Sequence, residues 1–276
     1  MAGKLVIVGT PIGNLSDFSP RAVQAMQNCD FIAAEDTRVT VKLLNHFGIK
    51  KPMVSYFEHN KLQRGEVICS RIEQGETCVL VSDAGMPAIS DPGEMLVAQC
   101  VQRDIDVCVV PGPTAVISAL AVSGLPTGRF TFEGFLSMNK KSRKAHLDEL
   151  KEEHRTMVFY EAPHKLAATL NDLLTALGDR NIAIVREITK IHEEVIRTTL
   201  LQAAQYYGQN PLKGELVLVI QGAQKQHTTV YTPEQAAEKA AFYMQNGLSA
   251  SEAAKQAAQE TGCKKGDVYR LLMKMG

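Results

Sequence analysis

The chain has 276 residues, of which 45% are hydrophobic and 22% are charged, and this composition excludes a disordered or fibrous protein. Lys and Arg total 30, and so do Asp and Glu, which excludes a surface that is positive throughout but allows a local basic face. The length allows two domains and a third, smaller one.

Short β-branched runs alternate with helical patterns in the first half of the chain. They occupy residues 4–8, 31–34, 53–56, 79–81 and 107–110. Strands without polar alternation, separated by helices, predict a parallel sheet that is covered on both faces. We therefore expect an α/β domain in this half and bound it at residues 1–125.

After about residue 128 the predicted strands lie closer together, as antiparallel pairing allows, at residues 130–135, 156–160, 181–186, 195–200 and 215–220. They predict a second α/β domain with a mixed sheet at residues 126–224. The polar stretch 222–232 then leads into an Ala-rich third domain, residues 225–276. Its residues 251–261 and 264–274 predict a helix-turn-helix-like pair around Gly262.

The six cysteines lie in mostly apolar stretches, with no CxxC pair and no histidines at metal spacing. We expect reduced cysteines in the core and no metal site. The uncharged stretch 107–128 is long enough to span a membrane, but Pro111, Pro113 and Pro126 interrupt it. It predicts a buried strand, a turn and a helix. The first apolar run ends at Gly9 and is too short for a signal peptide, so we expect a cytoplasmic protein.

Four turns after the predicted parallel strands have unusual sequences. Gly-Thr-Pro-Ile-Gly-Asn occupies residues 9–14, and Glu-Asp-Thr-Arg occupies residues 35–38. A Ser-Asp-x-Gly pattern occurs twice within residues 82–93, and Pro-Gly-Pro-Thr-Ala occupies residues 111–115. Ligands of open parallel sheets bind beyond the carboxyl ends of the strands. Four such loops at one sheet edge predict a site for a ligand with polar and flat apolar parts.

The acid pair Glu35-Asp36 admits two interpretations. In dinucleotide enzymes an acid at the end of the second strand holds a ribose, which would suggest an NAD-dependent oxidoreductase. The GxGxxG pattern of those enzymes is missing here, which disfavours that function. Alternatively, the pair caps the helix that follows it.

The loops, together with three motifs from the second half, resemble the tetrapyrrole methylase superfamily, whose members transfer methyl groups from S-adenosylmethionine. The added motifs are Phe-Tyr-Glu-x-x-His at residues 159–164, Arg-Glu-x-Thr-Lys at 186–190 and Lys-Gly-Glu at 213–215. More narrowly, the set is similar to the branch that methylates small-subunit ribosomal RNA, over residues 4–222 and with a similar helical tail.

The resemblance implies a two-domain tetrapyrrole methylase-like fold with a small helical domain. It also implies 2′-O-methylation of a cytidine ribose in the decoding region of 16S ribosomal RNA, free or in the small subunit, by a homodimer. The cofactor would lie between the two α/β domains. The implied cofactor-binding residues are Pro11, Ile12, Asp83, Ala84, Gly85, Met86, Ala88, Thr114, Ala115, Tyr160, Glu161, Gly214, Glu215 and Leu216.

Methyl transfer to a ribose hydroxyl needs the oxygen held in line with the methyl group, and a base would help. The catalytic candidates are strand-end residues of the shared motifs, each with a structural ion pair as its alternative: Glu35, Asp36, Glu187 and Lys190. Arg38 suits a phosphate, because its guanidinium matches that group in charge and geometry.

Two segments are locally basic despite the zero net charge. Residues 139–144 carry four cations and no acid, and residues 255–274 carry five cations and two acids. Either can contact phosphates, or can be an ordinary solvated surface. The RNA-binding candidates besides Arg38 are Lys140, Lys141, Arg143, Lys144, Lys264, Lys265 and Arg270.

Two further functions stay open. A small-molecule methylase of the same superfamily would need neither basic segment. A non-catalytic RNA-binding assembly factor would use both segments without any chemistry.

Overall fold

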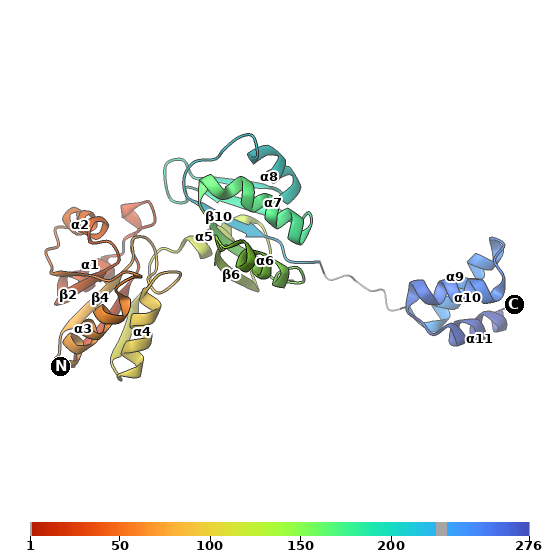
Figure 1. The fold of residues 1–276 in the computed structure, drawn as a ribbon, viewed down its shortest axis with the longest axis horizontal. Helices are drawn as coiled ribbons and strands as arrows, with labels where there is room; N and C mark the ends of the chain where they lie inside the picture. The colour runs from red at the N-terminus through yellow and green to blue at the C-terminus, as the bar shows by residue number, and fades with distance from the viewer. Residues whose placement is uncertain (1, 225–230, 276) are drawn as a thin grey trace. The chain divides into compact units, whose positions relative to one another are not determined.

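A computed structural model describes residues 2–224 and 231–275 of the chain (Figure 1). The chain divides into two compact units, residues 1–223 and 224–276. The first unit contains two five-stranded sheets, and the described part of the second unit is helical. Most of the polar stretch predicted at 222–232 lies outside the described residues. The division of the first unit at residue 125 remains a proposal.

The first sheet is parallel throughout, with the strand order β3-β2-β4-β1-β5. Its strands are β1 (Lys4–Val8), β2 (Phe31–Ala34), β3 (Met53–Ser55), β4 (Thr77–Val81) and β5 (Asp106–Val110). The intervening helices are α1 (Pro20–Asn28), α2 (Thr37–His46), α3 (Lys61–Glu73) and α4 (Gly93–Gln102), and α5 (Ala115–Ser123) follows β5. The predicted α/β class and the parallel sheet are confirmed.

Consecutive residues of β1 face opposite sides of this sheet, as the strand period requires. Leu5 belongs to the core formed with Ile68 of α3 and Leu96 of α4. Val6 belongs to the core on the other face, formed with Met26 of α1 and Leu44 of α2. Helices therefore cover both faces, which explains why these strands lack polar alternation.

Strand β5 departs from the prediction of a buried strand. It lies at the edge of the sheet, and Val109 is 52% exposed. Cys108 is also exposed and Cys263 is half-buried, so the expectation that all cysteines lie in the core was wrong for these two. Cys29, Cys69, Cys78 and Cys100 are buried as predicted. An edge strand has a neighbouring strand on one side only, and the hydrophobic residues of β5 do not indicate that it lies at the edge of the sheet.

The second sheet is mixed, with the order β6-β7-β10-β8-β9 and a parallel pairing only between β6 and β7. Its strands are β6 (Phe130–Phe135), β7 (Thr156–Glu161), β8 (Asn181–Arg186), β9 (Glu194–Thr199) and β10 (Leu216–Ile220). Its helices are α6 (Lys140–Glu149), α7 (Leu166–Leu177) and α8 (Leu200–Tyr207). The predicted mixed sheet is thus confirmed.

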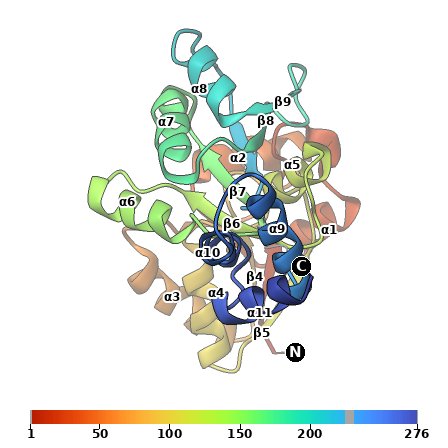
Figure 2. The ribbon, with the colours of Figure 1, turned by 90° about the vertical axis from the view of Figure 1, so that its right-hand side faces the viewer.

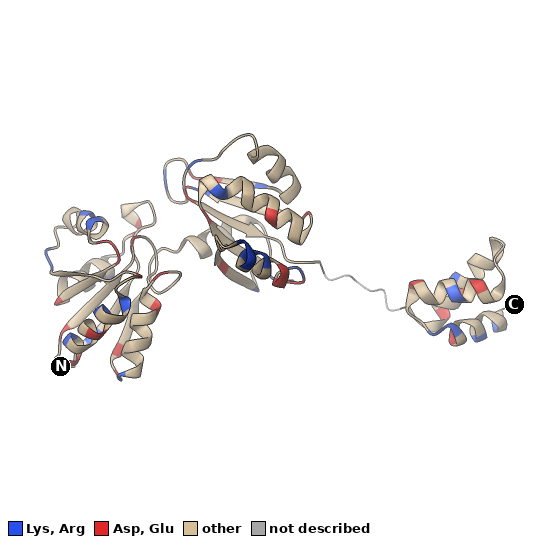
Figure 3. Ribbon diagram, in the orientation of Figure 1, with Lys and Arg blue, Asp and Glu red and all other residues tan. Residues whose placement is uncertain are grey.

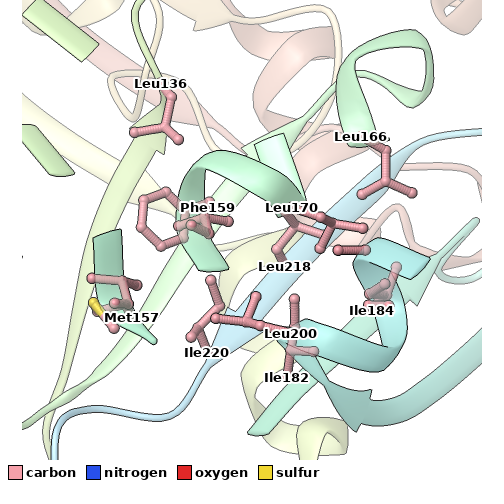
Figure 4. Packing of buried hydrophobic residues seen from close by; sticks show 14 of the residues in the cluster. Leu136, Met157, Phe159, Leu166, Leu170, Ile182, Ile184, Leu200, Leu218 and Ile220 are labelled. Atoms are coloured by element: carbon pink, nitrogen blue, oxygen red, sulfur yellow. The ribbon is translucent and has the colours of Figure 1, made fainter. Parts of the chain in front are cut away.

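Helices α6, α7 and α8 contribute to one core of this sheet (Figure 4). Leu166, Leu170 and Leu173 lie at helical spacing on α7 and are buried against strand residues such as Phe159 and Leu218. The other face packs on α5, through residues such as Leu120. Helix α5 therefore links the last strand of the first sheet to the second sheet.

The described part of the second unit consists of α9 (Pro233–Gln245), α10 (Ala250–Thr261) and α11 (Lys265–Met275) (Figures 1 and 2). Alanines of α9 and α10 are buried with Val268 and Leu272 of α11. Helix α10 begins in a capping box at Ser249 and ends at Gly262, whose φ of 73° permits the left-handed turn into α11. The predicted helix, turn and helix are present, shifted by one residue at some ends.

Candidate functional site

The first and fourth loops of the parallel sheet touch through two glycines. A Cβ placed on Gly9 would lie 2.7 Å from Gly112 Cα, and one placed on Gly112 would lie 2.8 Å from Gly9 Cα. Thr10 and Gly85 exchange backbone hydrogen bonds of 2.9 and 3.1 Å, which attach the first loop to the third. The three loops therefore form one continuous surface at the carboxyl edge of the sheet, where the sequence predicted them.

The third loop is held in shape by the carboxylate of Asp91. It accepts hydrogen bonds from the backbone N–H groups of Ala88 (3.0 Å), Ile89 (3.2 Å) and Gly93 (2.8 Å). Ala88 and Ser90 have φ values of 67° and 64°, a conformation that non-glycine residues rarely adopt. A strained loop fixed by three hydrogen bonds presents a predetermined surface to a ligand.

The two residues of the acid pair have different environments. Asp36 caps α2, accepting from Arg38 N at 2.8 Å, and its carboxylate also forms a salt bridge of 2.7 Å with the Arg38 guanidinium. The side-chain hydrogen bonds from Arg38 lower the pKa of Asp36 to about 2. Asp36 therefore makes the structural cap and ion pair that the sequence offered as its alternative. The Arg38 side chain is nevertheless 88% exposed, so its guanidinium faces solvent at the start of α2.

Glu35 instead lines a cavity beside the third loop. Its carboxylate accepts a 3.4 Å hydrogen bond from the backbone N–H of Asp83. Burial, followed by the neighbouring charge of Asp83, raises the pKa of Glu35 above its ordinary value. Burial also raises the pKa of Asp83, whose carboxylate accepts from Asp36 N at 3.0 Å.

The second sheet contributes an aromatic and an acidic wall. Tyr160 of β7 lies 5.1 Å from Phe132 and 5.4 Å from Phe135 between ring centres. The next residue, Glu161, is buried; its carboxylate accepts a 2.7 Å hydrogen bond from Ala162 N and another from the Thr169 hydroxyl. Thr169 in turn accepts a 2.8 Å hydrogen bond from Arg143.

These walls enclose a cavity of about 470 Å³ between the loops of the first sheet and the strand ends of the second. Its volume lies within the range of small-molecule and cofactor sites. Most of the implied cofactor-binding residues line it: Ile12, Asp83, Ala84, Gly85, Met86, Thr114, Ala115, Tyr160, Glu161, Glu215 and Leu216. Pro11, Ala88 and Gly214 do not line it.

Sequence reasoning missed ten lining residues: Ser82, Ile89, Ser90, Asp91, Phe135, Ala162, Pro163, Val185, Ile188 and Val217. Several lie inside motifs that the sequence had singled out, so the motifs rather than single positions carried the signal. Phe135 had no such signal, because it ends a strand whose position at the cavity depends on how β6 pairs with β7.

Glu187 and Lys190 form an ion pair next to this cavity. Lys190 Nζ lies 2.9 Å from Glu187 Oε1 and 3.2 Å from Glu215 Oε2, and Glu187 Oε1 accepts from Glu215 N at 2.8 Å. A Cβ on Gly13 would lie 2.5 Å from Lys190 Cγ, so Lys190 also packs on the first loop. Partial burial lowers the pKa of Lys190, but the contacts with Glu187 and Glu215 outweigh it and raise the pKa.

The described residues hold no group of three or more His, Cys, Asp and Glu side chains that could bind a metal ion. Within the same ranges, every helix is too short or too polar to cross a membrane.

The chain matches the family of tetrapyrrole (corrin/porphyrin) methylases over residues 4–204. It is 46% identical to the ribosomal RNA small subunit methyltransferase I of Synechocystis sp., over 99% of this chain and 98% of that protein. Its identity to the protein of the same name from Bacillus subtilis is 41%, over 97% of this chain and 93% of that protein. The chain belongs to the ribosomal RNA small subunit methyltransferase I family.

Solved structures agree on the fold. The match to uroporphyrin-III C-methyltransferase from Thermus thermophilus covers 79% of this chain and 94% of that chain, with a TM-score of 0.56 and 17% identity. A conserved hypothetical protein from Aeropyrum pernix covers 99% of this chain and 96% of its own, with a TM-score of 0.62 and 14% identity. The predicted superfamily, its fold and the narrower family are therefore confirmed.

The basic segment at residues 139–144 forms the start of α6 in this family member (Figure 3). Lys140, Lys141 and Lys144 are exposed. Arg143 is 15% exposed, and its guanidinium donates to Asp172 at 2.6 Å and to Thr169 at 2.8 Å. The sequence grouped Arg143 with the lysines, but the structure directs its side chain towards α7. An arginine engaged in this way is not available for a phosphate.

In the second unit, Lys264, Lys265 and Arg270 are exposed. Lys265 donates to Ser251 Oγ at 3.1 Å, and Arg270 pairs with Asp267 at 3.0 Å. Exposed pairs of this kind are weak, so these cations can exchange their partners for phosphates.

Proposed function

We propose that this family member transfers a methyl group from S-adenosylmethionine to the ribose 2′-oxygen of a cytidine in the decoding region of 16S ribosomal RNA. The observation that carries the proposal is the cavity between the two sheets, which is lined by residues of the loop motifs on which the resemblance rests. A structural neighbour, uroporphyrin-III C-methyltransferase from Thermus thermophilus, was solved with S-adenosylhomocysteine, the demethylated form of that cofactor.

The cavity suits S-adenosylmethionine chemically. Met86, Ile188 and Phe135 offer apolar surface for an adenine ring, while Asp83 and Glu35 offer carboxylates for a ribose and for the positive sulfonium. Bound there, the cofactor would supply an activated methyl group. The cofactor contacts that we propose are the predicted residues that line the cavity. Pro11, Ala88 and Gly214 lie in the loops that carry those residues, and we do not assign them a direct contact.

Glu35 is the best placed of the four catalytic candidates to accept a proton. It alone among them lines the cavity, and the raised pKa of its carboxyl makes it a stronger base than an ordinary Glu. Asp36 caps α2 and has a pKa of about 2, so we assign it to holding the start of that helix. The Arg38 side chain is 88% exposed, so we keep Arg38 among the cations proposed to contact a phosphate.

We assign Glu187 and Lys190 to positioning. Hydrogen bonds from Glu215 N and Lys190 lower the pKa of Glu187, which keeps its carboxylate charged. The charged pair contacts Glu215, a lining residue, through the Glu215 backbone N–H and carboxylate. The Lys190 side chain also packs against Gly13 of the first loop. A protonated Lys190 cannot take a proton from the ribose, but it can steady both sides of the cavity.

RNA is held, in this proposal, by exposed cations outside the cavity. Lys140, Lys141 and Lys144 share the first turns of α6. Lys264, Lys265 and Arg270 lie at the start of α11 and on its surface. Such cations release counterions when they contact phosphates, so affinity would fall as salt rises.

We further propose that the protein is cytoplasmic, since its proposed substrate belongs to the ribosome. We also propose that it is a homodimer. Exposed apolar side chains around the edge strand β5 support the dimer. Val101 of α4, Val109 of β5 and Ile117 of α5 are 61%, 52% and 49% exposed. Exposed apolar surface of this kind marks interaction sites in folded proteins.

The experiment is methylation of small ribosomal subunits that lack the modification, with labelled S-adenosylmethionine, followed by mapping of the label on 16S ribosomal RNA. The proposal predicts one methylated cytidine ribose in the decoding region. Label on a base, or label only on an added tetrapyrrole precursor, would overturn it. Saturation binding of S-adenosylhomocysteine without any methyl transfer would favour a non-catalytic assembly factor.

A further inference from the structure

A second hollow, of about 310 Å³, lies beside the cofactor cavity. Ser82 and Asp83 line both spaces, so the third loop forms a wall common to the two. Thr10 also lines the second hollow, and its hydroxyl donates to the Ser82 carbonyl at 3.3 Å. Only the third loop would therefore separate a group in this hollow from the cofactor cavity.

One face of α2 forms the opposite side of the hollow. Val39, Lys42, Leu43 and His46 line it, at the three- and four-residue spacing that places side chains on the same face of a helix. Pro11 of the first loop and Leu15 complete the apolar part. Leu15 and Val39 are 43% and 39% exposed, so apolar surface in this hollow faces solvent.

The polar groups of the hollow differ at its two sides. Asp83, with a carboxylate, lies at the wall that the two spaces share, and Lys42 and His46 lie on the helix side. A nucleotide has the same distribution of groups. Its base is flat and apolar on both faces, its ribose hydroxyls donate to carboxylates, and its phosphate needs a cation. The size lies at the low end of small-ligand sites, as expected for one nucleotide and too little for a tetrapyrrole.

We propose that the hollow formed by the first loop, α2 and Asp83 receives the target nucleotide of the RNA, with its ribose against the wall shared with the cofactor cavity. This inference rests on the proposed function. Val39 and Leu43 would pack on the base, and Lys42 would contact a phosphate. Asp83 and Glu35 would then lie on the side of the ribose from which its 2′-proton leaves.

Filling the hollow tests this assignment. Val39→Trp places a large side chain in it, and Val41→Trp is a matched control. Val41 is 38% exposed on the same helix but lies two positions further along, where it lines a different surface hollow. We expect Val39→Trp to lower kcat/KM for small subunits by roughly 100-fold, because misplaced reactants lose their alignment. S-adenosylhomocysteine affinity, measured by calorimetry, is expected to stay within about twofold.

A charge variant gives a second readout that does not depend on filling the space. Lys42→Glu is expected to weaken RNA binding and to lower the slope of log affinity against log salt by about one. Lys4→Glu, at the opposite end of the parallel sheet, is the control and is expected to keep the wild-type slope.

Unchanged methylation by a folded Val39→Trp would overturn the proposal, as would an unchanged salt slope for Lys42→Glu if Val39→Trp does not fold. Loss of S-adenosylhomocysteine binding in Val39→Trp would assign the hollow to the cofactor, and a change from dimer to monomer would assign it to a second copy. Failure of the wild-type protein to methylate ribose would contradict the proposed function instead.

Discussion

Arg143 of α6 donates a 2.8 Å hydrogen bond to the hydroxyl of Thr169 on α7, and that hydroxyl donates to the carboxylate of Glu161 at the cavity. Through this relay a residue of the basic segment reaches the cavity wall. Arg143 also pairs with Asp172, so its removal leaves two polar partners without their donor.

We therefore expect Arg143→Ala to behave differently from its lysine neighbours. It should lower the free energy of unfolding by about 1–3 kcal/mol, because the buried Thr169 hydroxyl loses its donor. It should leave the salt slope of RNA binding unchanged. The combined Lys140→Ala, Lys141→Ala and Lys144→Ala variant should lower the salt slope of RNA binding and leave the free energy of unfolding nearly unchanged. Urea unfolding and RNA binding at several salt concentrations measure the two effects, and equal salt slopes for the two variants would contradict this division.

A second prediction concerns the contact between Gly9 and Gly112. A Cβ at either glycine would lie under 3 Å from the other backbone. Gly112→Ala should therefore cost roughly 1–3 kcal/mol of stability, since the loops must separate. It should also weaken S-adenosylhomocysteine binding. Gly128→Ala is the control, because a Cβ there would have no atom within 4 Å. Wild-type stability of Gly112→Ala in urea would show that the loops can separate freely.

Glu35 and Asp36 provide a direct comparison of two adjacent carboxylates. Glu35→Gln should lower kcat by roughly 10²–10⁴-fold if Glu35 is the base, while Asp36→Asn should change it little. In the wild-type protein, kcat should fall as the pH is lowered through the raised pKa of Glu35, because the protonated carboxyl no longer accepts a proton. A single-turnover pH profile that is identical in wild type and Glu35→Gln would exclude this role.

The pair Glu187–Lys190 predicts a pH-dependent contribution to stability. The pKa of Glu187 is lowered in the folded protein, so its contribution is full above the ordinary value near 4.5 and is lost as the pH falls through the lowered one. The stability difference between wild type and Glu187→Gln should therefore shrink in acid. The raised pKa of Lys190 has the opposite sign, and its contribution should be lost above about 10.5. Urea titrations across this pH range measure both, and a difference that is constant with pH would refute the ion pair.

Much of the fold was accessible from the sequence, because buried parallel strands are continuous apolar runs and their turns carry distinctive residues. The strands at 31–34, 130–135 and 181–186 have the predicted bounds. The edge position of β5 was not accessible, since β-branched residues occur in edge and central strands alike. The loop motifs likewise indicated the cavity but not its lining residues from β6 and β8, which depend on sheet pairing.

The sequence by itself determined the family, the parallel and mixed sheets, and the four loops at one sheet edge. Only the tertiary structure separated residues that the sequence treats alike. Glu35 lines the cavity while Asp36 caps a helix, because consecutive residues at the end of a strand point in different directions. Arg143 is drawn to Thr169 while Lys144 stays exposed, because a helix turns about 100° per residue and only one face meets α7. The 30 cations of this chain with zero net charge therefore include some that stabilise the fold and others that remain accessible to a phosphate. Side-chain packing decides to which group each cation belongs.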